Sequence, residues 1–256
     1  MAFSLEDVRG TRRDMPERLL IHGIHKVGKT TFAASAPGCI FIPTEDGQES
    51  VDANAFPLCR SWDDILSAIT TLYTEPHEFK TAVLDSGDWA ELLARKAVCD
   101  EHNQSGIEEF GYGKGYQFTA ERYAEMLDGL NALRLERGMR IVMVVHTEIK
   151  KFEDPLADAY DRYQIKLHKS IGKLVQEWAD VIGFAQAAAT TKEEKKDFQA
   201  KGDKGRTRAI DLGKRIVCFE RSAAYDAGNR FGLPAELPLD WSAYEAALTE
   251  AKNRSK

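Results

Sequence analysis

The feature that most constrains this chain is a glycine-rich run at residues 23–30, which reads G-I-H-K-V-G-K-T. It matches the pattern G-x-x-x-x-G-K-[ST] at every fixed position. An apolar run at 18–22 precedes it and a helix-forming run at 31–35 follows it, which is the strand–loop–helix context that the pattern requires. Backbone N–H groups of such a loop surround phosphate oxygens, and the helix N-terminus adds partial positive charge. The sequence therefore predicts a site for a nucleoside triphosphate.

The residues expected to hold the nucleotide form one continuous segment. They are Gly23, Ile24, His25, Lys26, Val27, Gly28, Lys29, Thr30 and Thr31. Lys29 is expected to reach the β- and γ-phosphates and to act in catalysis, and Thr30 to place its hydroxyl on Mg²⁺. A second metal ligand is expected where an apolar strand ends, and Asp85 stands there. The expected cofactors are ATP and Mg²⁺, although no base-recognising residue excludes GTP.

Composition narrows the class of protein. The chain has 256 residues, of which 43% are hydrophobic and 30% charged, which suits one α/β domain with extra elements. A net charge of −6 means that any nucleic-acid contact must come from local basic patches. Four dispersed cysteines without C-x-x-C spacing argue against a zinc site or a disulfide framework and fit the cytoplasm. No signal peptide or run of about 18 apolar residues is present, so we expect no membrane association.

Short apolar runs alternate with helix-forming segments along the chain. Strands are expected at 18–22, 39–42, 81–86, 140–146, 180–186 and 215–219, and helices at 61–73, 88–102, 118–137, 169–178 and 241–253. Continuously apolar strands indicate a mainly parallel sheet with helices on both faces, and the late strands should add an antiparallel edge. Residues 147–166 are expected to form a long loop.

Three regions are expected along the chain. They are an N-terminal arm at 1–17, a P-loop domain at 18–240 with a basic hairpin at about 190–215, and a C-terminal helix and tail at 241–256.

Hydrolysis of a bound triphosphate needs a group that orients or deprotonates water. Glu45 follows the strand at 39–42, so its carboxylate should lie at the same sheet edge as the phosphate loop. Asp46 is the alternative candidate for the base. The alternative without a catalytic function is that Glu45 is an exposed acid in a turn. His146 ends the strand at 140–146 and could contact the γ-phosphate and report its loss to the following loop. A neutral, hydrogen-bonded interior histidine is the alternative for this residue.

Four segments in this order resemble the RecA-like ATPase core: the phosphate loop, 41–47, 83–86 and 142–146. The resemblance implies that Glu45 is the catalytic glutamate and that His146 is the sensor before a DNA-binding loop. Residues 229–234 look like the RecA segment that carries two lysines into a neighbouring subunit's ATP site. Arg230 matches one of these lysines, and Gly228 stands in place of the other. The resemblance therefore implies a single cation acting across a subunit interface.

The chain resembles more closely a group of bacteriophage P-loop proteins, some of which are single-strand annealing recombinases. The resemblance covers most of residues 3–240 and includes the opening at 3–8, the glycine-aromatic run at 111–116, and Asn229-Arg230. It implies an ATPase that assembles as a ring or filament on single-stranded DNA and promotes annealing or recombination. It also implies a single-stranded-DNA-binding protein as a partner and, for a phage protein, a bacterial cytoplasm as the location.

Three segments could contact DNA. Aromatic and basic side chains gather at 104–118, at 147–166 and in the basic hairpin. The candidates are Tyr112, Lys114, Tyr116, Lys150, Lys151, Arg162, Lys204, Arg206 and Arg208. Aromatic rings stack on unpaired bases and cations neutralise phosphates. Each segment also has a reading without DNA contact. The aromatic side chains of 104–118 could pack beneath the segment or at a subunit interface, and the basic hairpin could be a solvated flexible loop. The segment 147–166 carries almost no net charge, which weakens the case for phosphate contacts there.

Two other functions share the same ATP site. A phage helicase or helicase loader would unwind duplexes or engage a helicase. A nucleotide-dependent switch would act on a protein partner without binding DNA, and the acidic net charge favours this reading.

Overall fold

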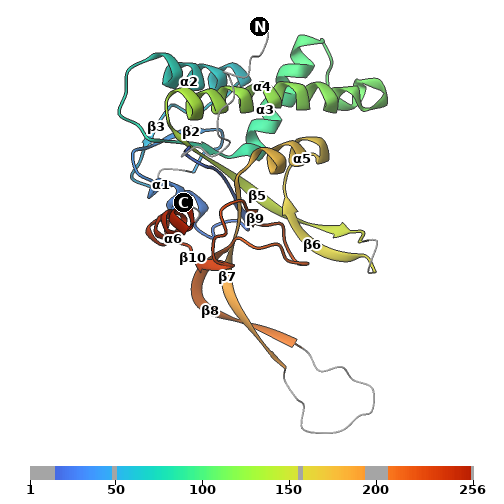
Figure 1. The fold of residues 1–256 in the computed structure, drawn as a ribbon. Coiled ribbons are helices and arrows are strands. Elements are labelled where there is room, and N and C mark those ends of the chain that lie inside the picture. Colours follow the sequence, from blue (N-terminus) through green and yellow to red (C-terminus); the bar gives the residue numbers. More distant parts are fainter. Residues whose placement is uncertain (1–14, 48–50, 155–157, 194–206, 255–256) are drawn as a thin grey trace, which may run out of the picture.

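The computed structural model describes residues 15–47, 51–154, 158–193 and 207–254 (Figure 1). Most of the expected N-terminal arm (residues 1–14) and the tip of the expected basic hairpin (194–206) lie outside the described residues. Residues 15–17 form no strand and lead directly into the sheet.

A mixed sheet organises the described residues. Its strands are β1 (Arg18–Gly23), β2 (Cys39–Pro43), β3 (Asn54–Ala55), β4 (Thr81–Asp85), β5 (Arg140–Phe152), β6 (Tyr160–Ile165), β7 (Val181–Glu193), β8 (Thr207–Cys218), β9 (Gly228–Asn229) and β10 (Glu236–Pro238). The main order is β10-β8-β7-β1-β5-β4-β2-β3. The pairs from β7 to β3 are parallel, whereas β8, β9 and β10 pair antiparallel. The expected fold class, a P-loop α/β sheet with a late antiparallel edge, is confirmed.

Helices cover both faces of the sheet (Figure 1). They are α1 (Lys29–Ala34), α2 (Trp62–Thr74), α3 (Gly87–Glu101), α4 (Lys114–Glu136), α5 (Lys169–Trp178) and α6 (Trp241–Arg254). Successive strand residues point to opposite faces. Leu20 therefore packs into one core with α2 to α5, while Leu19 and Ile21 pack into a second core with α1 and α6. Burial on both faces explains why the parallel strands are continuously apolar.

The strand order brings the predicted site residues to one edge. β5 lies between β1 and β4, and all three strands run in the same direction. Gly23 at the end of β1 is opposite His146, and Pro43 at the end of β2 is opposite Asp85. The carboxyl ends of parallel strands meet at one edge, so the loops that follow these strands lie together.

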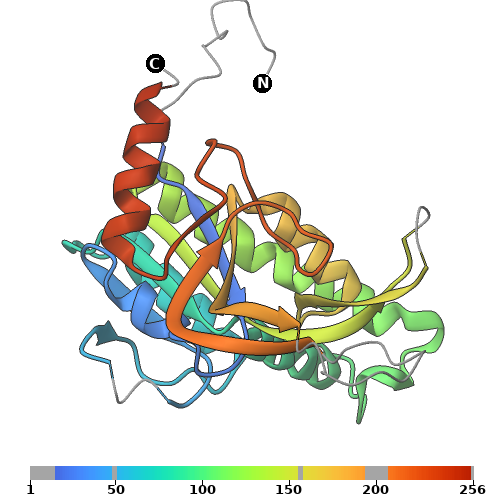
Figure 2. The same cartoon turned by 90° about the horizontal axis from the view of Figure 1, so that it is seen from below.

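The prediction of a long loop at 147–166 is wrong. β5 continues through residues 147–152, and β6 returns beside it in antiparallel register from Thr147↔Ile165 to Phe152↔Tyr160. Figure 2 shows this β5–β6 hairpin reaching outward on the side of the molecule opposite α6. Threonine, isoleucine, phenylalanine and tyrosine favour strands. Backbone pairing, the contact between the Phe152 and Tyr160 rings and the bonds of the buried Arg162 hold this segment without a continuous apolar core.

Helix α4 begins earlier than expected. Lys114 starts the helix after Gly113, whose φ of 72° places it in the left-handed region. Short 3₁₀ turns at Ile107–Glu109 and Gly111–Gly113 precede it. Tyr116 and Phe118 are therefore helical residues and do not belong to a loop.

We predict that Ser61→Ala lowers the free energy of unfolding by about 1 kcal/mol. Ser61 caps α2: its hydroxyl accepts a hydrogen bond from the Asp64 N–H at 3.2 Å, and Asp64 Oδ2 accepts from the Ser61 N–H at 2.9 Å. Denaturant unfolding would measure the change. Ser67→Ala in the exposed middle of α2 is the control, and it should cost nothing because alanine favours helices. Equal stability of the two variants would contradict the prediction.

Candidate functional site

The backbone of the phosphate loop is fixed by two glycines. A Cβ on Gly23 would lie 2.2 Å from the Ala185 carbonyl oxygen of the neighbouring strand, so only glycine fits at the end of β1. Gly28 has a φ of 106° and caps α1. The chain therefore turns tightly between a buried strand and a helix, and this turn directs backbone N–H groups inward.

The Lys29 ammonium lies inside the loop. Its Nζ donates hydrogen bonds to the carbonyls of Gly23 at 2.9 Å and Ile24 at 3.0 Å. An ammonium has a third N–H, which a phosphate oxygen in the loop could accept. Burial lowers the Lys29 pKa, and the negative charges of Asp85, Asp88 and Glu45 oppose this shift. These carboxylates favour the charged form that a phosphate requires.

Thr30 and Asp85 provide a fitting place for Mg²⁺. The Thr30 hydroxyl donates to Asp85 Oδ2 at 2.9 Å, and the Asp85 side chain is buried. Magnesium prefers oxygen ligands and usually binds one or two carboxylates together with substrate phosphates. No cluster of three or more histidine, cysteine or acidic side chains suited to a metal occurs in the described ranges, so the phosphates would have to complete the coordination.

Thr44 joins the ends of β2 and β4. Its hydroxyl donates to the Ser86 carbonyl at 2.7 Å and accepts from the Ser86 N–H at 2.7 Å, and its own N–H donates to the Asp85 carbonyl at 2.8 Å. These bonds fix the position of Glu45, the next residue, beside Asp85. Sequence reasoning assigned Thr44 no role, because its bonds cross 42 residues of chain.

Glu45 faces His146 across the site. Its Oε1 lies 3.7 Å from His146 Nε2. Burial raises the pKa of the Glu45 carboxyl, Asp85 and Asp88 add to the rise, and His146 opposes it. A raised pKa makes this carboxylate more basic than an ordinary glutamate, as suits a group that takes a proton from water. Asp46, the alternative base, is exposed.

Asp88 fixes the position of His146. Its Oδ1 accepts the His146 backbone N–H at 3.1 Å, and its Oδ2 lies 3.0 Å from His146 Nδ1. A carboxylate only accepts, so Nδ1 carries the hydrogen and Nε2 faces Glu45. Burial would raise the Asp88 pKa, but the hydrogen bonds and charge of His146 lower it on balance. Asp88 was missed from the sequence, where it could be read only as an acid in the first turn of a helix.

The same carboxylate contacts both sides of the base of the β5–β6 hairpin. His146 lies in β5, and Lys166, the residue after β6, has its Nζ 3.7 Å from Asp88 Oδ2. The Lys166 N–H also donates to the His146 carbonyl at 2.8 Å. The His25 ring of the phosphate loop stands 4.7 Å from the His146 ring, and repulsion from His146 is the main reason that its pKa is lowered. The phosphate loop and the hairpin base therefore meet at His146.

Of the DNA-binding candidates in the segment 104–118, two side chains are exposed and one packs against the protein. Tyr112 is fully exposed, and Lys114 at the start of α4 is also exposed. Tyr116 instead stacks on the His168 ring at 4.2 Å, lies under the Arg95 guanidinium and hydrogen-bonds Glu108. Its ring therefore has a partner within the chain.

The remaining DNA-binding candidates are scattered. Lys150 and Lys151 are exposed on β5, and Lys150 pairs with Glu148 at 2.7 Å. Arg208 lies in β8 opposite Lys192. The candidates Lys204 and Arg206 lie outside the described residues.

The Arg162 prediction needs correction. This side chain is only 2% exposed, and its guanidinium donates to the carbonyls of Ser222 and Tyr225 and pairs with Asp226 at 2.8 Å. A buried, bonded guanidinium is not positioned to contact DNA.

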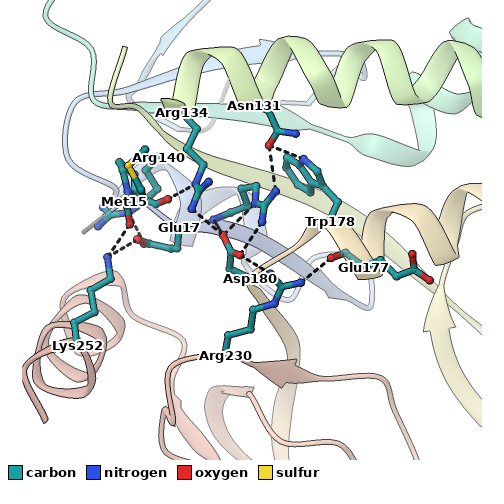
Figure 3. A network of polar contacts seen from close by, with 12 residues as sticks. Met15, Glu17, Asn131, Arg134, Arg140, Glu177, Trp178, Asp180, Arg230 and Lys252 are labelled. Atoms are coloured by element: carbon teal, nitrogen blue, oxygen red, sulfur yellow. Dashed lines mark hydrogen bonds and ion pairs between the residues drawn. The ribbon is translucent and has the colours of Figure 1, made fainter. Parts of the chain in front are cut away.

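Arg230 lies at the opposite edge of the sheet from the phosphate loop. Figure 3 shows its guanidinium directed at Asp180, with which it pairs at 3.2 Å, and at the Glu177 carbonyl, to which it donates at 2.8 Å. Arg18 at the start of β1 shares the same carboxylate. Arg230 is thus not brought to the nucleotide site of its own chain, and its expected action on a neighbouring subunit stays a prediction.

A comparison with protein families decides the classification. Residues 15–231 match the family model described as an AAA domain. The chain belongs to the AAA domain family. This AAA domain is a nucleotide-binding P-loop ATPase, in agreement with the loop geometry around Lys29. The curated proteins give no match to it. Among its described residues, the AAA domain has no helix both long and apolar enough to cross a membrane.

We predict that Lys29→Ala weakens ATP binding at least tenfold, because it removes the buried ammonium inside the phosphate loop. Isothermal titration with ATP and Mg²⁺ would measure this. Lys26→Asn is the matched control: it removes one exposed charge from the same loop but keeps the backbone N–H through which this residue would bind phosphate. Asparagine also tolerates the φ of 60° found there. Equal weakening in both variants would show that general loop charge, not Lys29, binds the phosphates.

Proposed function

We propose that this AAA domain hydrolyses ATP with Glu45 as the base that activates water, and that its nucleotide state controls assembly on single-stranded DNA. In this proposal the assembled protein promotes annealing or recombination during phage replication. The observation that carries it is the continuous contact from Glu45 through His146 and Asp88 to the base of the β5–β6 hairpin.

The hydrolytic part rests on the order of groups at the sheet edge. Lys29 and Thr30 come from the phosphate loop, Asp85 ends β4, and Glu45 follows β2. When Mg²⁺ is bound, it supplies charge that stabilises the phosphate oxygens. The protein's own groups orient the triphosphate and hold a basic carboxylate, Glu45, near where water would attack. His146 Nε2 would lie close enough to respond to the γ-phosphate.

The switching part rests on Asp88. Any shift of His146 on loss of the γ-phosphate would disturb the hydrogen bonds that Asp88 accepts from its backbone and ring. Lys166 shares that carboxylate, so both strands of the hairpin would respond together. An element whose position depends on the γ-phosphate can change the affinity for a partner at its surface.

The DNA part rests on the resemblance to phage annealing proteins and on the exposed Lys150, Lys151 and Tyr112. Several subunits side by side would add their modest patches, which suits a chain of acidic net charge. In such a ring or filament, Arg230 would have to leave Asp180 to reach the γ-phosphate of the next subunit, where a cation stabilises transition-state charge.

A protein switch without DNA binding is the second candidate. Three observations favour it: Arg162 is buried, Tyr116 is packed against His168, and Lys150 is paired with Glu148. Ile149 on the hairpin is 61% exposed and could pack against a partner protein.

We predict that Glu45→Gln retains ATP binding but lowers the hydrolysis rate at least a hundredfold, as expected for loss of a general base. In the unchanged protein, only the ionised carboxylate acts. Because the Glu45 pKa is raised, hydrolysis should fall on acidification at a higher pH than for an ordinary glutamate. Phosphate release across a pH series would measure this, and the residual activity of Glu45→Gln should lack that transition.

Asp46→Asn is the matched control, since it removes the exposed neighbouring carboxylate. Loss of hydrolysis in Asp46→Asn, with full activity in Glu45→Gln, would assign the base to Asp46.

We predict that single-stranded DNA binds far more tightly with a slowly hydrolysed ATP analogue than with ADP or no nucleotide. Fluorescence anisotropy at about 50 mM salt would measure it, because low salt preserves phosphate contacts. Lys29→Ala should abolish the dependence on nucleotide. Asp88→Asn should still bind ATP but lose most of the difference between ATP analogue and ADP.

An undiminished nucleotide effect in Asp88→Asn would contradict coupling through that carboxylate. Absence of DNA binding in every state, with ATP still bound, would rule out the DNA function and favour the protein switch.

A further inference from the structure

A groove of about 610 Å³ lies between the β5–β6 hairpin, helix α5 and the segment after β8. Apolar side chains line part of it, namely Phe152, Ile165, Leu167 and Ile182. The groove is separate from the phosphate loop, and nothing in the nucleotide chemistry uses it.

The rim of this groove is basic. Lys150, Lys169, Lys173 and Arg221 all line it and are exposed. Lys169 and Lys173 stand one turn apart on α5, so their side chains share one face about 6 Å apart. Neither of these two lysines has an ion-pair partner in the part of the chain that the structure describes.

Acidic side chains offset only part of this charge, since Lys150 pairs with Glu148 at 2.7 Å, whereas Lys169 and Lys173 have no such pair among the described residues. Asp226 is half-buried and pairs with the buried Arg162 guanidinium at 2.8 Å. Glu177 is the other carboxylate among the lining residues. Arg162 also covers the Phe152 ring, with 4.8 Å between its guanidinium carbon and the ring centre. The result is an apolar and aromatic floor beneath a cationic rim.

Both walls of the groove are attached near the ATP site. The hairpin wall starts at His146 and Lys166, which share Asp88. The helical wall starts at α5, where the His168 N–H before the helix donates to Glu91 Oε2 on α3 at 2.8 Å. A ligand that spans the groove would therefore contact two elements anchored beside the nucleotide.

We propose that this groove binds the backbone of single-stranded DNA, with Lys169, Lys173 and Arg221 contacting phosphates and the apolar floor receiving bases. A cationic track beside an apolar and aromatic surface is the general design for single strands, whose bases are unpaired and whose phosphates are charged. The inference rests on the proposed DNA function and identifies its path. The phosphate contacts along this path come from α5 and Arg221, and the buried Arg162 is not among them.

The test compares two triple variants of the full chain by anisotropy with a labelled oligonucleotide and the ATP analogue. The groove variant is Lys169→Ala, Lys173→Ala and Arg221→Ala. The control is Arg60→Ala, Lys80→Ala and Lys96→Ala, which removes the same charge from exposed positions outside the groove. We expect at least tenfold weaker binding for the groove variant alone, and a salt dependence of log affinity reduced by about 2.

Equal binding by wild type and groove variant would overturn the groove while leaving the DNA function intact. Failure of wild type to bind DNA in any nucleotide state would remove the proposed function itself. Groove-dependent binding of a polyglutamate peptide without DNA binding would overturn the nucleic-acid assignment in favour of an acidic protein partner.

A second test measures protection of a groove residue by bound DNA, and it does not require a loss of affinity for DNA. The four native cysteines are buried, so Lys173→Cys would place an accessible thiol in the groove. Single-stranded DNA should slow its alkylation in the presence of the ATP analogue, and Lys96→Cys should show no such protection. Equal alkylation rates at Lys173→Cys with and without bound DNA would contradict the groove.

Discussion

The buried carboxylate of Asp88 connects the nucleotide site to the base of the β5–β6 hairpin. It accepts the backbone and ring hydrogens of His146 and lies 3.7 Å from Lys166, so one buried group holds both strands of the hairpin at their base. A buried carboxylate is costly unless it is paired, and here the pairing outweighs the burial. The orientation of His146 toward Glu45 and the position of the hairpin base thus depend on the same few bonds, while Arg162 holds β6 to the segment after β8.

Much of the fold could be predicted because its signals are local. The glycine pattern at 23–30 requires a strand before it and a helix after it, and Ser61 with Asp64 marks the start of α2 within four residues. The pairing of residues 147–152 with 160–165 was missed because these residues are not continuously apolar, although Ile149, Phe152 and Tyr160 favour a strand. A two-stranded extension carries a weaker sequence pattern than a strand buried on both faces.

The candidate site likewise contains some residues that could be predicted from the sequence and others that could not. Lys29, Thr30 and Asp85 follow from motif and strand position, and the structure brings them together with Glu45 and His146. Asp88 could not be found, since its partner lies 58 residues away. Arg162 looked like a surface cation because charge in a sequence does not reveal burial. Its bonds to the segment after β8 depend on tertiary contacts that no local pattern encodes.

The cluster around Asp180 has a consequence for assembly. Three guanidiniums share this one carboxylate: Arg18 at 2.8 Å, Arg230 at 3.2 Å and Arg134 at 3.6 Å. Arg230 is the outermost, with 59% of its side chain exposed. If it withdrew, two cations would still neutralise Asp180, so no buried charge would be left alone. Asp180 can therefore lose Arg230 and still be neutralised. An anion on a neighbouring molecule could then bind the Arg230 guanidinium without destabilising this edge of the sheet.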